Sequence, residues 1–171
     1  MNVATRRIAL TSVSAALIVV FNALPMGLPP SINPLPLRVP STLLPMIVAM
    51  VDPWAAALGS LIGHFSYDYV YLGLGALPAL FGPWCFVIFG YLMKRKGGPD
   101  LWKVLVGSVI CIGWITATLT ISFWLLGVMP LAVAFNVIFF SITPTLIICD
   151  VILVSLLPRL RQVLRLDQKM A

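Results

Sequence analysis

Two of the few side chains in this 171-residue chain that could do chemistry lie close together. His64 and Asp68 are four residues apart in the segment GHFSYDYVYLG, so a helix would place both on one face. Asp68 could then accept a hydrogen bond from His64, with Tyr67 and Tyr71 nearby. One imidazole and one carboxylate are too few ligands for a metal. The cluster therefore predicts a small-molecule site, and the alternative for its tyrosines is an aromatic belt at a membrane surface.

Other polar or aromatic side chains lie inside long apolar segments. Trp84 and Trp114 fall near the middle of such segments, where anchoring at a membrane surface does not explain an indole. They either pack in the core or stack on a planar ligand. Asn136 lies near the outer end of the last apolar segment and could face a pocket. Asp150, farther along that segment, indicates a hydrogen bond to another helix, a contact with a partner, or a substrate contact.

The catalytic repertoire of the chain is narrow. It has one histidine and five acidic residues, and it has no HExxH, GxSxG or phosphate-loop motif. We expect no enzymatic activity, no cofactor and no metal, so any active transport would need energy from another protein. The cysteines lie inside apolar segments without metal-binding spacing, which predicts buried, unpaired side chains: Cys85, Cys111 and Cys149.

The elements that must position these residues are apolar. The sequence is 61% hydrophobic and 9% charged, whereas a soluble domain carries roughly 25% charged residues. Such a chain cannot cover a surface that faces water, so we expect an all-α integral membrane protein with one domain, residues 1–171. Six segments are predicted to cross the membrane, at about 8–28, 37–51, 53–71, 74–93, 102–127 and 130–158.

Helix boundaries can be predicted from capping residues. Asp52 followed by Pro53 is a helix start signal, which implies a tight turn between the second and third segments. Asp100 is expected to cap the fifth segment, and Pro130 to open the sixth. The second segment is short, so it is either a full crossing or an interfacial or re-entrant segment.

The basic residues suggest an orientation. Apart from Arg38, they fall at the start of the chain, at 94–103 and in a basic tail at 159–171. Positive residues favour the cytoplasmic side, so six crossings would place both termini and the loop at about 94–101 inside. We therefore expect a multi-pass membrane protein. A nucleic-acid binder would gather its basic residues on one folded face, so no nucleic-acid partner is expected.

Two further features of the sequence bear on partners and ligands. Ser12 and Ala16 are four residues apart in the first segment, a small-residue spacing that lets another helix approach closely. Either internal packing or a partner helix would use it. The outer loop, about 28–40, is rich in proline and carries Asn33, with Arg38 at the start of the next segment.

Three stretches together resemble the substrate-binding S components of energy-coupling factor (ECF) transporters, which import vitamins and related micronutrients. They are RRIALTSVSAALIVVFNALP, PPSINPLPLRVPSTLLPMIVAMV and DPWAAALGSLIGHFSYDY, which cover roughly the first 70 residues. The resemblance implies a six-helix bundle in a prokaryotic plasma membrane, with cytoplasmic termini, a membrane scaffold partner and two cytoplasmic ATPases. The first helix of that family packs on the scaffold through an AxxxA pattern, which Ser12 and Ala16 fit with one alanine replaced.

The resemblance also gives a role to the proline-rich loop, which in that family covers the bound substrate. Prolines reduce the ordering entropy of such a lid, with Asn33 and Arg38 as polar contacts at the rim. The alternative is a plain connector. Thiamine, riboflavin, biotin, queuosine precursors and pyridoxine-like compounds all remain candidate ligands. The alternative function is a structural membrane scaffold of the rod-shape type, which binds no small molecule and has partners in wall synthesis.

Overall fold

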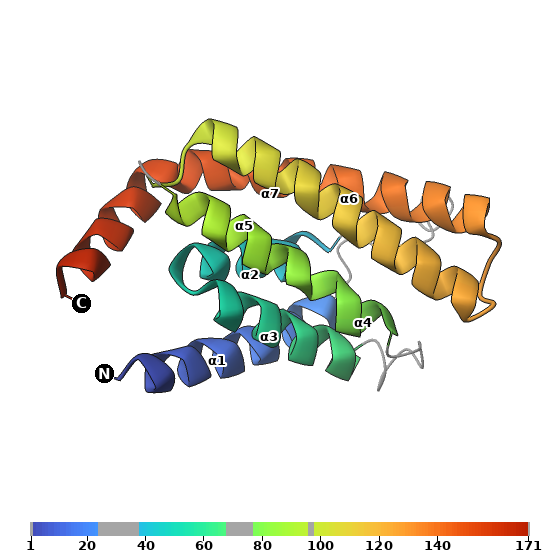
Figure 1. The fold of residues 1–171 in the computed structure, drawn as a ribbon, viewed down its shortest axis with the longest axis horizontal. Coiled ribbons are helices and arrows are strands. Elements are labelled where there is room, and N and C mark those ends of the chain that lie inside the picture. The colour runs from blue at the N-terminus through green and yellow to red at the C-terminus, as the bar shows by residue number, and fades with distance from the viewer. Residues whose placement is uncertain (1, 24–37, 68–76, 96–97, 171) are drawn as a thin grey trace.

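The computed structural model describes residues 2–23, 38–67, 77–95 and 98–170, and these ranges contain helices, turns and no strand. The predicted all-helical fold is therefore confirmed. The elements in chain order (Figure 1) are α1 (Val3–Ala23), α2 (Val39–Val51), α3 (Pro53–His64), α4 (Leu77–Phe81), the 3₁₀ helix η2 (Gly82–Trp84), α5 (Cys85–Lys94), α6 (Leu101–Leu125) and α7 (Leu131–Met170).

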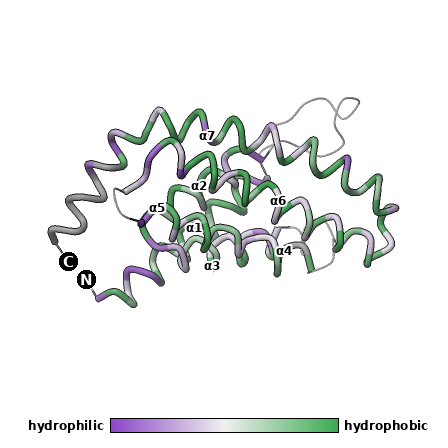
Figure 2. Tube along the Cα trace, turned by 45° about the horizontal axis from the view of Figure 1, so that its top comes forward, coloured by the Kyte–Doolittle hydropathy of each residue, from purple (hydrophilic) through white to green (hydrophobic). Residues whose placement is uncertain are grey.

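Three helices in the described part of the chain are long and apolar enough to cross a membrane. They are α1, α6 and the Leu131–Leu160 part of α7, with 21, 25 and 30 residues. Two shorter apolar helices, Val39–Val51 and Ala79–Lys94, lie beside them. Figure 2 shows hydrophobic residues along most of the bundle, with hydrophilic stretches near the end that carries both termini.

The turn between α2 and α3 forms as its sequence predicts. Asp52 caps α3, because its Oδ1 accepts from the backbone N–H groups of Trp54 (3.0 Å) and Ala55 (3.2 Å), and Pro53 occupies the first helical position. The other carboxylate oxygen accepts from Arg7 Nε at 2.8 Å. Burial acts to raise the pKa of Asp52, but the Arg7 and backbone hydrogen bonds outweigh it and hold that pKa below its usual value.

The start of α6 is also capped as predicted. Asp100 accepts from the backbone N–H of Lys103 at 2.8 Å. The Lys103 ammonium in turn donates to the backbone carbonyls of Gly98 (2.6 Å) and Arg95 (3.2 Å), which closes the connection from α5.

Glycines allow α1 and α3 to approach closely. A Cβ at Gly59 would lie 2.7 Å from Ser14 Cβ, and one at Gly63 would lie 2.7 Å from Ile18 Cβ and 2.9 Å from the Ala15 carbonyl oxygen. The two glycines form a GxxxG spacing, which brings helix backbones together. The face of α1 that packs on α3 is thus the one that carries Ser14, Ala15 and Ile18.

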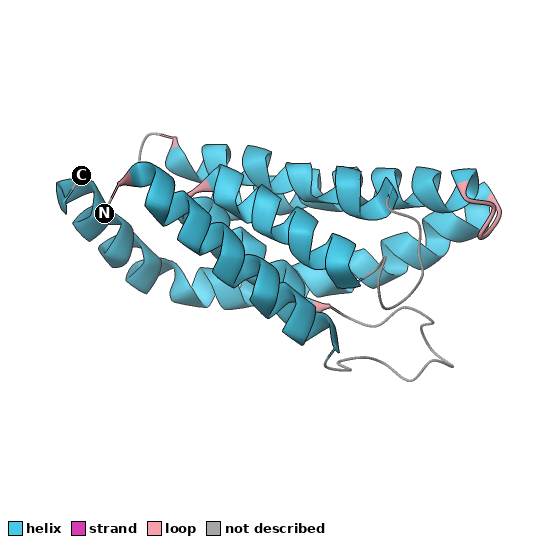
Figure 3. Cartoon of the chain, turned by 90° about the horizontal axis from the view of Figure 1, so that it is seen from below, coloured by secondary structure: helices cyan, strands magenta, loops and turns pink. Residues whose placement is uncertain are grey.

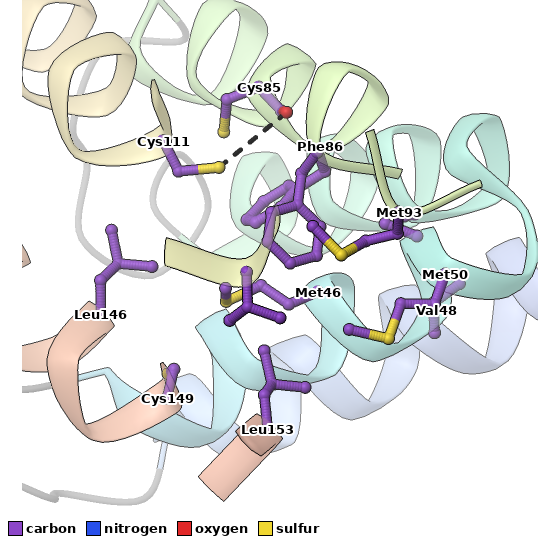
Figure 4. Packing of buried hydrophobic residues seen from close by; sticks show 14 of the residues in the cluster. Met46, Val48, Met50, Cys85, Phe86, Met93, Cys111, Leu146, Cys149 and Leu153 are labelled. Atoms are coloured by element: carbon purple, nitrogen blue, oxygen red, sulfur yellow. Dashed lines mark hydrogen bonds between the residues drawn. The ribbon is translucent and has the colours of Figure 1, made fainter. Parts of the chain in front are cut away.

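The core lies where α2, α5, α6 and α7 meet, and Figure 4 shows its side chains. Phe89 is fully buried and contributes to it together with the thiols. Cys85, Cys111 and Cys149 are all buried and free, as predicted. Sulfur-containing and apolar side chains fill this region: Met46, Met50, Phe86, Met93, Leu146 and Leu153.

The helices differ from the expected segments at three places. The fourth segment is broken, because Gly82 and Pro83 interrupt the helix between α4 and α5. The first helix begins at Val3 rather than near residue 8, and the last runs to Met170 through Pro158 instead of ending there. The residues at 24–28 and 68–71, which were assigned to the first and third segments, lie outside the described ranges.

Both termini lie at the same end of the bundle (Figures 1 and 3). The Arg7–Asp52 pair joins the start of α1 to the end of α2 and the start of α3 at this end. A Cβ at Gly90 would lie 2.4 Å from the Ala49 carbonyl oxygen, so the end of α5 reaches the same level. The basic residues near the start of α1 and around the α5–α6 connection therefore lie at this end, called here the basic end.

Candidate ligand-binding site

The opposite end of the bundle brings together the end of α1, the start of α2 and the end of α3. This follows from the pairing at the basic end, because α1 and α3 both run away from it and α2 runs towards it. Asn22, Arg38, His64 and Tyr67 come from these three helix ends, and all four are partly buried. Polar side chains in an otherwise apolar bundle are costly, so their convergence marks a candidate site.

A hydrogen bond joins α1 to α3 within this site. Asn22 Nδ2 and His64 Nδ1 lie 3.2 Å apart. When the amide donates, Nδ1 accepts, and the ring hydrogen lies on Nε2. The other amide atom, Asn22 Oδ1, is buried and has no hydrogen-bond partner among the described residues. The pair therefore leaves an acceptor that a bound molecule could use.

A second contact joins α2 to α3. The guanidinium carbon of Arg38 lies 5.6 Å from the centre of the Tyr67 ring, a cation–π arrangement. Residues 65–67 continue α3 as a wider π-helical turn, and this turn carries Tyr67. Ser41 Oγ donates to the Arg38 carbonyl at 3.1 Å, which fixes the backbone just before α2. Tyr67 is one helical turn from His64, so the two contacts adjoin.

This set of groups is suited to binding rather than to catalysis. It offers a fixed cation, an aromatic ring, an imidazole and an amide. No group of three or more His, Cys, Asp or Glu side chains that could hold a metal occurs in the described part of the chain. Arg38 and Tyr67 were predicted site residues, as was His64, and the structure brings them together.

The two predicted tryptophans serve the break between α4 and α5. Trp84 Nε1 donates to the Leu80 carbonyl at 2.7 Å, and Trp114 Nε1 donates to the Phe81 carbonyl at 2.9 Å. Trp84 also lies edge-on to Trp54, with ring centres 6.3 Å apart. Trp54 is in the first turn of α3, and ten residues of helix, about 15 Å, separate it from His64. The structure therefore places Trp84 away from the polar cluster.

Other predicted residues also lie apart from the cluster. Asn136 is exposed in the second turn of α7, where its amide donates to the Ala132 carbonyl at 3.0 Å. Ser12 and Ala16 are exposed on α1, on the side that does not pack against α3. Asp150 accepts a hydrogen bond from Ser108 Oγ of α6, which is the first of the three interactions that its sequence position left open.

Three predicted site residues, Asn33, Asp68 and Tyr71, lie outside the described residues, so the His64–Asp68 hydrogen bond remains a prediction. Sequence reasoning missed Asn22, although a lone amide near the end of an apolar helix was a usable signal. It also missed Gly59 and Gly63, whose GxxxG spacing was visible.

No protein-family model, no curated protein and no solved structure matches the chain. The fold and the site by themselves define the class of the protein: an all-helical chain with membrane-length helices and a polar cluster at one end.

Proposed function

We propose that the chain is the substrate-binding subunit of an ATP-driven importer of the energy-coupling factor type, specific for a vitamin or a related small micronutrient. The observation that carries the proposal is the convergence of Asn22, Arg38, His64 and Tyr67 at the end of the bundle opposite the basic end. A small molecule that arrives from outside would meet this cluster first if the basic end faces the cytoplasm.

The proposed topology has six crossings with both termini inside a prokaryotic plasma membrane. It is supported by the shared end of the two termini and by the basic residues found there. In this topology α2, α3 and the broken α4–α5 unit are the short crossings. The predicted lid is the loop before α2, which carries Asn33 and would close over the cluster. Asp68 and Tyr71 are proposed to belong to the cluster itself.

The energy source is proposed to lie in other proteins. The chain has no nucleotide-binding motif, so it would bind and release its substrate while two cytoplasmic ATPases and a membrane scaffold drive transport. Ser12 and Ala16 are exposed on α1 and lie on a face that a scaffold helix could cover. The alternative function for this chain is that of a structural membrane protein of the rod-shape type. Such a protein binds no small molecule, so it would not need the polar cluster.

Cysteine accessibility tests the topology. The native cysteines are buried, so Val128→Cys in the exposed α6–α7 turn and Arg159→Cys near the basic end can be compared in intact cells with a membrane-impermeant maleimide. Val128→Cys should react from outside, and Arg159→Cys should react only after the cells are opened. The reverse pattern would overturn the orientation.

Purification from the host's own membranes tests the function. Recovery of a scaffold protein, two ATPases and a stoichiometric small molecule is the expected result. Recovery of wall-synthesis proteins without a small molecule would favour the structural alternative instead.

A further inference from the structure

A patch of aromatic, apolar and basic side chains lies on the outer surface of the bundle, where α3 packs against α5 at the basic end. We propose that this α3–α5 patch, formed by Trp54, Leu58, Ile88, Tyr91 and Arg95, binds an anionic phospholipid. The lipid phosphate would contact Tyr91 and Arg95, and an acyl chain would lie on the apolar side chains. The proposal goes beyond the proposed function, because it requires only that the basic end lies at a membrane surface.

The depth of the patch in a membrane follows from the packing of α5 on the turn between α2 and α3. A Cβ at Gly90 would lie 2.7 Å from Pro53 Cγ, so Gly90 is level with this turn. Arg7 forms its ion pair with Asp52 of the same turn. Charged groups of this kind are costly among acyl chains, so the turn belongs at the headgroup level. Tyr91, the residue after Gly90, therefore lies where lipid phosphates are found, a level that tyrosine favours.

The hydroxyl group of Tyr91 has a donor to offer. Trp54 Nε1 donates to the Tyr91 hydroxyl oxygen at 3.1 Å, and the hydroxyl hydrogen has no acceptor in the part of the chain that the structure describes. Tyr91 is 53% exposed and Trp54 42% exposed, so both side chains lie on the outer surface. At a membrane surface the available acceptors are water and lipid oxygens. An ionised phosphate forms the strongest hydrogen bond of these.

Arg95 supplies the positive charge of the patch. It follows Tyr91 by four residues at the end of α5, so the two side chains leave the helix on the same face. The Arg95 side chain is exposed, and its guanidinium makes no hydrogen bond or ion pair to another described residue. Asp52 and Asp100, which lie at this end, are engaged as caps of α3 and α6. A guanidinium matches phosphate oxygens with two parallel N–H groups, and a basic surface favours an anionic lipid over a zwitterionic one.

The apolar side chains of the patch indicate a lipid rather than a soluble anion. Ile88 precedes Tyr91 by about one turn of α5, and Leu58 follows Trp54 by about one turn of α3. Because α5 runs towards the basic end and α3 runs away from it, Ile88 and Leu58 both lie deeper in the membrane. Both are exposed. A lipid whose phosphate binds at Tyr91 and Arg95 would therefore place an acyl chain on these side chains and on the Trp54 ring.

Native mass spectrometry tests the proposal on the full chain. The protein is released from nanodiscs of equal amounts of phosphatidylglycerol and phosphatidylcholine, and the lipid retained by each chain is identified. The wild-type chain should retain phosphatidylglycerol in preference to phosphatidylcholine. Arg95→Gln should reduce this preference roughly fivefold, as loss of one cation at a membrane surface predicts. Arg159→Gln removes the same charge from another exposed position near the basic end and should keep the wild-type preference.

A variant of Tyr91 assigns the phosphate contact to the hydroxyl group. Tyr91→Phe keeps the aromatic ring but removes the donor, so retention of phosphatidylglycerol should fall roughly two- to tenfold. Trp102→Phe removes an N–H group from an exposed aromatic side chain outside the patch and should retain the lipid as the wild type does. Because Tyr91→Phe changes no charge, it also tests the patch if Arg95→Gln does not fold.

The contrary outcomes are distinct. A wild-type chain that retains no lipid, or retains the two lipids equally, would overturn the proposal. Equal loss of preference in Arg95→Gln and Arg159→Gln would replace the site with a diffuse attraction to the membrane surface. Release of the lipid by an excess of inorganic phosphate or glycerol phosphate would show that the patch takes a soluble anion. None of these measurements involves a transported molecule, so failure of the proposed function would leave their meaning unchanged.

Discussion

Asn22 and His64, 42 positions apart in the sequence, meet through their side chains at 3.2 Å and join the last turn of α1 to the last turn of α3. The bond orients the imidazole and holds together the two helices that carry most of the candidate site. Both side chains are partly buried, so the contact can influence a bound molecule as well as the bundle.

Removing either member of this pair should weaken ligand binding. His64→Ala or Asn22→Ala loses a hydrogen bond worth about 0.5–1.5 kcal/mol, which predicts up to a roughly tenfold higher Kd. The measurement is titration of the purified chain with its identified ligand. Gln162→Ala, an exposed position near the basic end, is the control and should bind as the wild type does. Wild-type affinity in both site variants would place the ligand elsewhere.

The close approach of α1 and α3 makes Gly63 a sensitive position. Gly63→Ala would put a Cβ 2.7 Å from Ile18 Cβ and 2.9 Å from a backbone oxygen, so the helices must move apart. Overpacking of this kind costs about 1–3 kcal/mol. Thermal unfolding in detergent should therefore shift to lower temperature. Gly113→Ala in α6 is the matched control, because nothing lies within 4 Å of a Cβ there, and it should cause no loss.

The ion pair between Arg7 and Asp52 predicts a dependence of stability on pH. The pKa of Asp52 in the folded chain is below its usual value of 3.8. The pair therefore contributes fully at pH well above 3.8, and its contribution is lost as the pH falls through the lower folded value. Arg7 is 44% exposed, so its share is small, about 0.2–1 kcal/mol.

Arg7→Gln should lower the unfolding temperature at neutral pH. Because the ion pair is then already absent, the unfolding temperature of the variant should fall less than that of the wild type when the pH is lowered. Arg159→Gln removes the same charge from an exposed position near the basic end and serves as the control. An acid profile for Arg7→Gln identical to that of the wild type would contradict the role assigned to the ion pair.

The tryptophans at the α4–α5 break provide a test of structural against ligand-stacking roles. Trp84→Phe and Trp114→Phe keep an aromatic ring but remove the N–H groups that satisfy the Leu80 and Phe81 carbonyls. Each should lower stability by about 1 kcal/mol, measured by thermal unfolding, and leave ligand affinity unchanged. Trp102→Phe, at a position 72% exposed, should have no effect. Unchanged stability with weakened binding would instead place the indoles against the ligand.

The exposed side of α1 is predicted to serve assembly. Ser12→Trp or Ala16→Trp should reduce the yield of the complex with scaffold and ATPases while ligand binding by the isolated chain stays normal. Val109→Trp, on an exposed position of α6, is the control for a bulky residue on the bundle surface. Assembly at the wild-type level in both α1 variants would remove this face from the proposed interface.

Local sequence signals predicted the helices well. Asp52 with Pro53 and Asp100 set the starts of α3 and α6, because capping depends on a few neighbouring residues. The break at Gly82 and Pro83 was missed, although glycine followed by proline is itself a local signal, because the apolar run was read as one span. The extension of α7 past Pro158 was missed because the segment was ended where the apolar run gives way to the basic tail.

The site was less predictable, because its residues meet only through tertiary packing. His64 and Tyr67 could be placed from their own helix, but Asn22 joins them only because Gly59 and Gly63 let α1 approach α3. Trp84 was assigned to the site because it lies near the middle of a predicted membrane-spanning segment. Its actual neighbour, Trp54, could not be identified without the packing of α3 against η2.

The central claim is that the chain binds one small molecule through the cluster at the end of α1, α2 and α3. Native mass spectrometry of the chain released from nanodiscs of host lipid tests it most directly. The account predicts one bound small molecule per chain in the wild type and its loss in the double variant His64→Ala with Arg38→Gln. A wild-type chain without bound mass, or a double variant that keeps it, would contradict the account.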